Sequence, residues 1–168
     1  SLGASFFRES LIALAVAILF MGLVVLIYFR TFVPSVAIIL AAFSDMAVAL
    51  AVMNLLDIKI GTAGIAAFLM LIGYSVDTDI LLTVRVLKRK EGTVMDRIIS
   101  SIKTGMTMTV TAIISTIVAL AVTQSEVIRQ IMLVLLIGLI ADIFNTWIQN
   151  VGLLRMYVER KARKGVII

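Results

Sequence analysis

Apolar residues run along the chain in long blocks, each close to twenty residues and each bounded by charged or turn-forming residues. An α-helix rises 1.5 Å per residue, so about 20 residues cross the roughly 30 Å of hydrocarbon in a bilayer. Backbone groups in lipid must be hydrogen-bonded within their own segment, which favours helices for such blocks. The pattern predicts an all-α polytopic membrane helix bundle in one domain, 1–168, with five spans at about 9–29, 34–56, 62–87, 105–123 and 130–154.

A different pattern occupies the link before the fourth span. Ile98, Ile99 and Ile102 recur at helical spacing, with charged and hydroxyl residues between them. An apolar face backed by a polar one is typical of a helix that lies on the membrane surface. We therefore expect a short interfacial helix on the cytoplasmic side. The alternative is an ordinary solvated loop.

The composition excludes several kinds of catalytic and metal-binding site. Hydrophobic residues make up 62% of its 168 residues, and it contains neither cysteine nor histidine. A soluble domain is normally about half apolar. Disulfides, thiol catalysis and Cys/His metal centres are excluded, and no cofactor or metal site is indicated. Proton transfer would have to use carboxyl groups, tyrosine or lysine, because no imidazole is present.

Most of the positive charge lies on one side of the predicted spans. Twelve of the fifteen Lys and Arg residues are there: Arg30, Arg85, Lys88, Arg89, Lys90, Arg97, Lys103, Arg155, Arg160, Lys161, Arg163 and Lys164. Basic loops stay in the cytoplasm, so we expect an extracytoplasmic N-terminus and a cytoplasmic basic tail, 155–168. Charge placed in this way orients a protein in the lipid bilayer and gives no reason to expect nucleic-acid binding. Because the chain begins at Ser1, we expect a fragment of a longer protein.

Two carboxylates interrupt the third span, Asp77 and Asp79. A charged side chain at the bilayer centre costs roughly 2.5 to 3.5 kcal/mol on insertion scales. Residues two apart on a helix point roughly 200° away from each other, so these two acids cannot be close partners. Ser75, Asp79 and Thr83 share one face, whereas Asp77 shares another with Gly73. We expect such a helix to lie at the centre of the bundle.

Other spans also carry polar groups at membrane depth. Asp45 lies in the second span, and Asp142 in the fifth, where Asn145 and Gln149 continue its face. The fourth span carries a hydroxyl stripe: Thr104, Thr107, Thr111 and Ser115. Two interpretations stay open. The polar groups make interhelical hydrogen bonds, with neutral acids among them, or the buried acids exchange protons in a relay.

Three segments carry motifs of a known family. Residues 73–85 (GYSVDTDILLTVR), 101–109 (SIKTGMTMT) and 141–150 (ADIFNTWIQN) resemble the fourth span, the entry to the fifth span and the last span of the SecF family of protein-export membrane proteins, in its archaeal form. The resemblance covers essentially the whole chain. It implies spans two to six of a six-span, RND-like half, with SecD and the SecY translocon as partners and exported polypeptides as cargo. In bacteria the family is linked to the proton gradient.

The resemblance also implies roles for charged residues. Family members from bacteria have an acid at the position of Thr78, and here Asp77 and Asp79 stand on either side of it. A basic residue of the fifth span corresponds to Lys103, and Arg85 ends the fourth-span motif. Asp77 and Asp79 would accept protons beside these cations. The full set of candidate intramembrane polar residues is Asp79, Asp77, Asp142, Asp45, Thr78, Asn145, Lys103 and Arg85.

Four functions can be weighed against these residues. The first is an auxiliary export subunit that couples carboxylate protonation to helix movement, and the second is a scaffold that holds SecD at the translocon. An intramembrane aspartyl protease needs a Gly-x-Gly-Asp motif, which the chain lacks. An RND-type efflux half would need a substrate-binding domain, for which the short loops leave no room. We expect a non-enzymatic export subunit, with the scaffold and the efflux half as alternatives.

Overall fold

The computed structural model describes residues 2–89 and 91–163. The elements in chain order are α1 (Leu2–Phe29), α2 (Phe32–Leu55), α3 (Thr62–Lys88), α4 (Val94–Val122), α5 (Glu126–Phe144), the π-helix η1 (Asn145–Asn150) and α6 (Val151–Arg163). In this described part, five helical segments are long and apolar enough to cross a membrane, and the last of them joins α5, η1 and α6. The predicted all-α membrane bundle is confirmed. The expected basic tail continues the last span as α6 up to Arg163, and its remainder, 164–168, lies outside the described residues.

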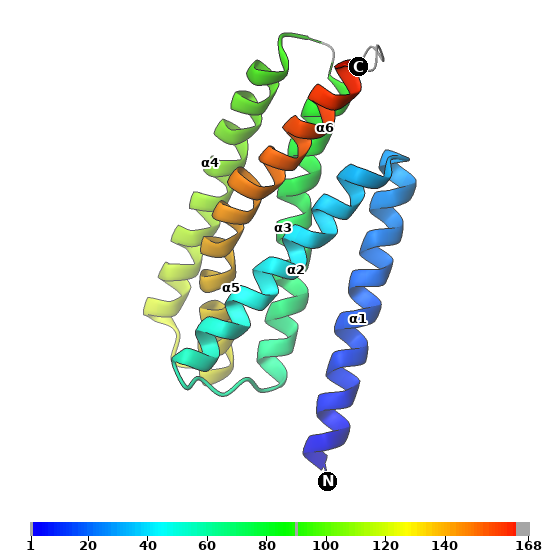
Figure 1. Ribbon diagram of the computed structural model, residues 1–168. Helices are drawn as coiled ribbons and strands as arrows, with labels where there is room; N and C mark the ends of the chain where they lie inside the picture. The colour runs from blue at the N-terminus through cyan, green and yellow to red at the C-terminus, as the bar shows by residue number, and fades with distance from the viewer. Residues whose placement is uncertain (1, 90, 164–168) are drawn as a thin grey trace.

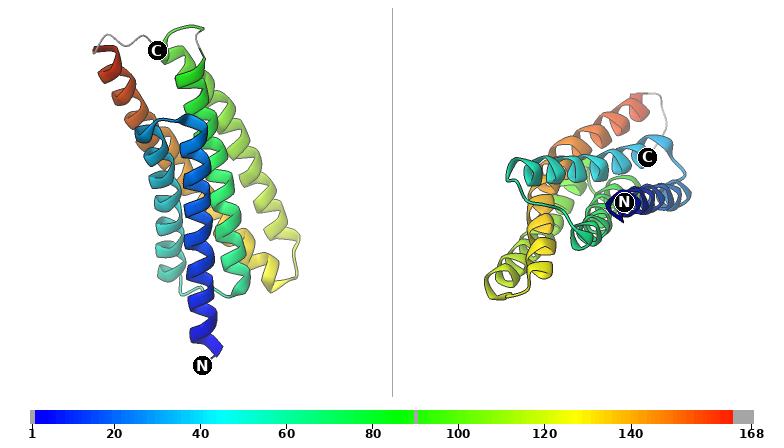
Figure 2. Two further views of the ribbon diagram at one scale, coloured as in Figure 1. Left: turned by 90° about the vertical axis from the view of Figure 1, so that its right-hand side faces the viewer. Right: turned by 90° about the horizontal axis from the view of Figure 1, so that it is seen from below.

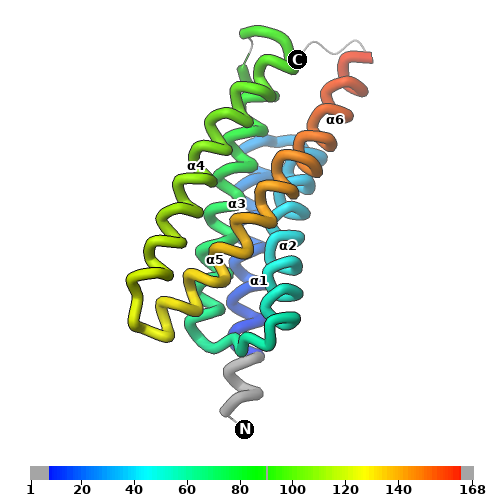
Figure 3. The backbone as a smooth tube through the Cα atoms, turned by 90° about the vertical axis from the view of Figure 1, so that its left-hand side faces the viewer, coloured from blue at the N-terminus to red at the C-terminus, as the bar shows by residue number. Residues whose placement is uncertain are grey.

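The helices form an elongated bundle with α2, α3 and α5 at its centre (Figure 1). Helix α1 packs on α2 and α3 at one edge, while α4 packs on α3 and α5 at the other. Figure 2 shows α1 standing apart from the α4–α5 hairpin. Helix α5 begins beside α4, crosses α3 obliquely and continues as α6 beside α2 (Figure 3). Each central helix therefore touches the two others, which is the arrangement needed to enclose polar side chains.

The segment expected to form a separate interfacial helix is helical but continuous with the fourth span. Helix α4 starts at Val94 because Thr93 and Asp96 form a capping box, in which the Thr93 hydroxyl accepts from the Asp96 N–H and the Asp96 carboxylate accepts from the Thr93 N–H. Ile98 is buried whereas Ile99 is 56% exposed, so the isoleucines do not share one apolar face. The prediction of a separate surface helix was therefore wrong.

Two arginines bind α3 and α4 together at the basic end of the bundle. The guanidinium of Arg97, on α4, is buried and donates to the carbonyl of Val86 (3.0 Å) and to that of Arg89, at the end of α3. In the other direction, Arg85 of α3 donates to the carbonyl and hydroxyl of Ser100 on α4 (2.7 and 3.0 Å). The bonds of Arg97 satisfy carbonyls that the end of α3 leaves without partners in its own helix.

The apolar core consists of two clusters. The first joins α1, α2, α3 and α5 and includes Val25, Ile38, Met53, Phe68, Leu71 and Val134. The second joins α3, α4 and α6 through Leu82, Val86, Ile98, Leu154 and Val158. Between them along α3 come Ser75, Thr78 and Asp79, all fully buried. The bundle thus carries a buried polar layer between two apolar ones.

A close approach of α5 to α3 aligns this polar layer. A Cβ atom on Gly138 would overlap the Leu71 side chain, so only glycine lets the two helices come this near. Asp142 lies one helical turn after Gly138, and Ser75 lies one turn after Leu71. The contact therefore brings the acid of α5 to the polar face of α3.

Candidate functional site: a buried carboxylate network

Three carboxyl groups meet in the polar layer. Asp45 of α2, Asp79 of α3 and Asp142 of α5 are each 0% exposed. They lie close enough together for their charges to interact. Among the described residues, no lysine or arginine forms an ion pair with any of them. Three unpaired negative charges in such a site would be costly, so hydrogen bonds and protons must stabilise the layer.

Asp45 links three elements through its two oxygens. Its Oδ2 accepts a hydrogen bond from the hydroxyl of Ser75 on α3 (2.5 Å). Its Oδ1 accepts from the side-chain amide of Asn145 in η1 (2.6 Å). Asp45 therefore fixes α2 against both α3 and the last span.

Asp79 and Asp142 are bridged by one hydroxyl group. The Oγ1 of Thr146 lies 3.0 Å from Oδ1 of Asp79 and 2.9 Å from Oδ1 of Asp142. Asp79 Oδ1 also accepts from the side-chain amide of Asn150 (2.6 Å). The Oδ2 atoms of Asp79 and Asp142 are buried and have no hydrogen-bond partner among the described residues.

The two contacts of Thr146 require a proton on one of the two carboxyl groups. A threonine hydroxyl carries one hydrogen and can donate to only one acceptor at a time. Both of its contacts, with Asp79 and Asp142, are at hydrogen-bond distance. The second contact becomes a hydrogen bond only when that carboxyl group carries a proton and donates to the threonine oxygen. Both contacts of Thr146 are therefore hydrogen bonds when the Asp79–Asp142 pair carries one proton.

The donors of this network come from the π-helix η1. Asn145, Thr146 and Asn150 supply three of the four side chains that bond to the carboxyl groups, and Ser75 supplies the fourth. In a π-helix the backbone bonds run from i to i+5, which brings residues five apart, such as Asn145 and Asn150, toward one face. Short π segments inside α-helices are frequent at functional sites.

The structure brings together four of the residues singled out in the sequence: Asp45, Asp79, Asp142 and Asn145. Thr78, at the position of the family acid, is buried beside them, but its hydroxyl donates to the Tyr74 carbonyl of its own helix (3.2 Å).

Three other candidates lie elsewhere. Asp77 is exposed on the opposite face of α3, as the 200° separation from Asp79 predicts. Lys103 is exposed, and Arg85 is occupied by Ser100 and Thr104 of α4. The two basic residues are therefore not the cationic neighbours of the buried acids that the resemblance implied.

The hydroxyl stripe of α4 is also placed differently from the expectation. Thr107, Thr111 and Ser115 are exposed, and each donates to the carbonyl four residues earlier in α4, at 2.7 to 2.9 Å. The interpretation of the stripe as interhelical bonds holds only for Thr104, which accepts from Arg85 of α3 (2.9 Å). For the other three it was wrong, because the helix backbone offers a nearer acceptor.

Sequence reasoning missed Thr146 and Asn150 as network members. Thr146 lies four residues after Asp142, on the same α-helical face as Asn145, and was overlooked there. The π-helix turns Asn150 rather than Gln149 to the buried side. The density of polar residues in 145–150 was the available signal, since a lipid-facing span does not carry four amide or hydroxyl side chains in six positions.

Comparison with known proteins places the chain among export proteins. Residues 1–160 match the family model described as "Protein export membrane protein SecD/SecF, C-terminal". The chain is 46% identical over 170 residues to the protein-export membrane protein SecF of Methanocaldococcus jannaschii, covering 98% of this chain and 60% of that protein. It is 50% identical over 155 residues to the SecF of Methanothermobacter thermautotrophicus, covering 89% and 54%. For the SecF of Thermococcus gammatolerans the identity is 49% over 159 residues, covering 95% and 50%.

The chain thus spans between half and three fifths of these curated relatives. The match extends over all five spans, including the segments that build the carboxylate network. With its five apolar helices, the chain is a multi-pass membrane protein that belongs to the SecD/SecF family of protein-export membrane proteins.

Proposed function

We propose that the full-length protein is an auxiliary subunit of the Sec translocase, which acts with SecD beside the SecY translocon to promote the export of polypeptides. Family membership supports the export role, since each of the three relatives above is named a protein-export membrane protein. The single observation that carries the mechanism is the buried trio of Asp45, Asp79 and Asp142. Intramembrane acids that face a bundle interior mark proton pathways in pumps and transporters.

The proposed mechanism uses the proton at the Thr146 bridge. When one proton sits on the Asp79–Asp142 pair, the hydroxyl satisfies both carboxyl groups and holds α3 against the last span. Loss of that proton leaves two charges facing one hydroxyl, and the like charges repel. Protonation therefore biases two packings of α3 against α5 and η1, which a proton gradient can drive alternately. The movement would be passed on to the translocon through the parts of the protein beyond this chain.

The orientation that we propose places the basic end of the bundle in the cytoplasm. Both α3 and α6 end there with basic residues in their last turn, whereas the opposite end carries Lys59 and Arg129 near its loops. The bias of lysine and arginine toward cytoplasmic loops supports this orientation. The first span of the chain would then enter from the extracytoplasmic side of the cell membrane.

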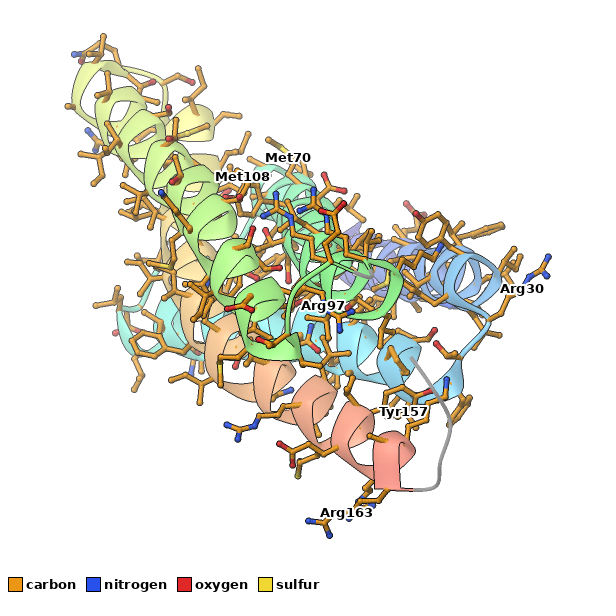
Figure 4. The ribbon with its side chains drawn as sticks, turned by 90° about the horizontal axis from the view of Figure 1, so that it is seen from above. Arg30, Met70, Arg97, Met108, Tyr157 and Arg163 are labelled. Atoms are coloured by element: carbon orange, nitrogen blue, oxygen red, sulfur yellow. The ribbon has the colours of Figure 1, made fainter. Side chains whose placement is uncertain are left out.

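SecD is proposed to dock on the face of α3 that points away from the carboxylate network. Asp77 is exposed there beside Gly73, at a depth where contact with lipid is costly. Met70 of α3 and Met108 of α4 are also exposed and lie on the same side of the bundle (Figure 4). A partner helix with a hydrogen-bond donor opposite Asp77 would remove that cost.

Asp77→Asn is therefore expected to weaken the complex with SecD. It removes the charge that a donor of SecD would meet, and recovery of SecD with the affinity-purified full-length protein should fall at least fivefold, since a charged hydrogen bond is worth about 1.5 to 3 kcal/mol. Asp79→Asn is the matched control on the same helix and should leave this recovery unchanged. Equal recovery of SecD with Asp77→Asn would place the docking surface elsewhere.

Asp79→Asn tests proton coupling with a side chain of the same shape. Asp79 makes its hydrogen bonds through Oδ1 alone, so an asparagine keeps an acceptor for Thr146 and Asn150, removes the titratable group and places an amide NH2 at the Oδ2 position. We expect export of a Sec-dependent precursor in cells to fall at least tenfold, while the amount of protein in the membrane is unchanged. The measurement is the fraction of precursor translocated after a short radioactive pulse.

Asp57→Asn is the matched control for this experiment. Asp57 is an exposed carboxylate in the loop between α2 and α3, with φ = 53°, a conformation that asparagine tolerates well. Export should be unaffected by this change. If Asp79→Asn also exports normally, the carboxylate network serves assembly alone and the scaffold function is the correct one.

A further inference from the structure

A groove lies where α2 begins and α6 ends, at the basic end of the bundle. Its volume is about 680 Å³, within the range of small-molecule sites in proteins. The lining residues are Val33 of α2 and, from α6, Leu153, Met156, Tyr157, Arg160, Lys161 and Arg163. None of these side chains belongs to the carboxylate network, so the groove is a separate feature of the fold.

One part of the groove is apolar and continuous with the lipid-facing surface. Val33 is 47% exposed and Met156 is 52% exposed, although both belong to the membrane-spanning segments. In Figure 4, Tyr157 lies between α6 and the start of α2. Tyrosine is enriched at the membrane–water boundary, where its ring is apolar and its hydroxyl is wet. The groove therefore straddles the level of the lipid headgroups.

The other part of the groove carries positive charge, and the part of the chain that the structure describes offers it no carboxylate partner. Arg155 forms an ion pair with Glu159 (2.8 Å), but among the described residues no carboxylate pairs with Arg160, Lys161 or Arg163. The ammonium of Lys161 lies 6.0 Å from the centre of the Tyr157 ring, at the rim of the groove. Three free cations thus stand directly beside an apolar wall.

We propose that this groove binds an anionic phospholipid. The phosphate group would be held by Arg160 and Lys161, and an acyl chain would lie along Val33 and Met156. Basic pockets between helices at the membrane surface bind anionic lipid headgroups, and arginine and lysine are the residues that recognise phosphate. An acidic protein segment would match the cations but not the lipid-facing apolar wall. Lipid binding here is independent of the export role, since it requires only the folded protein.

The experiment compares two lipids on the detergent-purified full-length protein. Bound dioleoyl phosphatidylglycerol and dioleoyl phosphatidylcholine are counted by native mass spectrometry at increasing lipid concentration. We expect the anionic lipid to bind at least tenfold more tightly. Each cation near the surface is worth roughly a fivefold change in affinity, so Arg160→Gln combined with Lys161→Gln should weaken phosphatidylglycerol binding about twenty-five-fold.

Two controls distinguish lipid binding in the groove from attraction of the lipid to surface charge in general. Arg30→Gln combined with Arg89→Gln removes two exposed charges from the same end of the bundle that do not line the groove, and it should weaken binding far less than the Arg160/Lys161 variant. Val33→Trp changes no charge but fills the groove, so it should weaken binding at least fivefold. All of these side chains are exposed or line the groove, and the variants are expected to fold.

Four results would overturn the proposal. One is an unchanged preference for phosphatidylglycerol in the Arg160/Lys161 variant, and another is an equal loss in the Arg30/Arg89 variant, which would indicate general surface charge. The third is normal binding by Val33→Trp, which would place the lipid outside the groove. A poly-glutamate peptide is tested in parallel, and its binding in place of phosphatidylglycerol would identify an acidic protein segment as the occupant.

Discussion

Arg97→Met is expected to destabilise the protein by about 3 to 5 kcal/mol. The guanidinium donates to the carbonyls of Val86 and Arg89, and a hydrogen bond from a charged donor contributes about 1.5 to 3 kcal/mol. Methionine has a similar length but no donor, so the last carbonyls of α3 would lose their partners in a buried position. The loss should be measured as a lower free energy of unfolding when the purified full-length protein is titrated with SDS in mixed micelles.

Arg155→Met is the matched control for the Arg97 variant. The side chain of Arg155 is 57% exposed and pairs with Glu159 one turn along α6, and surface pairs of this kind are worth less than about 1 kcal/mol. Arg97→Lys should give an intermediate loss, because an ammonium cannot reproduce the fork of the guanidinium. Similar unfolding energies for Arg97→Met and Arg155→Met would show that the α3–α4 contact does not depend on the buried arginine.

Thr146→Val is expected to cost about 2 to 3 kcal/mol of stability. Valine has almost the same shape, so the change removes one hydroxyl and leaves the packing intact. Hydrogen bonds between membrane helices average about 0.6 kcal/mol and reach about 1.7. This hydroxyl contacts two carboxyl groups, and both Oδ2 atoms already lack a partner, so both contacts should lie at the upper end of that range.

The controls for Thr146 lie in the same protein. Thr107→Val makes the same chemical change at an exposed position whose hydroxyl bonds only to its own helix, and it should change the unfolding energy by less than about 0.5 kcal/mol. Thr146→Ser keeps the hydroxyl and should recover most of the loss. If Thr146→Val is as stable as Thr107→Val, the bridge between Asp79 and Asp142 does not hold the helices together.

The spans and the burial of Asp45, Asp79 and Asp142 could be predicted from the sequence, because both follow from the cost of polar groups in lipid, whereas Asp77, expected to be sheltered with them, is exposed. Blocks of about twenty apolar residues leave helices as the structural solution, and five such segments are present. Helical geometry separated Asp77 from the face that carries Ser75, Asp79 and Thr83, but only the structure shows that this second face is the buried one. That reasoning could not say which helix would face Asp79, since several spans carry polar groups.

The full composition of the network could not be predicted, because the position of Asn150 depends on a departure from regular geometry. The π-helix replaces Gln149 by Asn150 on the buried face, and no local pattern signals where such a turn forms. Arg97 was taken for one of many cytoplasmic cations, yet its guanidinium is buried at the end of α3. The capping box of Thr93 and Asp96 was readable in the sequence and would have placed the start of α4 correctly.

The π-helix has a mechanical consequence for the end of the molecule. It lies directly between α5 and α6, so it sets the rotation of α6 about its own axis. One residue corresponds to about 100° in an α-helix, and a π turn holds one residue more than an α turn. Conversion of η1 to regular α geometry would therefore swivel α6 by about a quarter turn and carry Tyr157 and Arg160 away from the start of α2. The segment whose Asn145, Thr146 and Asn150 bond to the carboxyl groups thus also sets the rotation of the basic end of the last span.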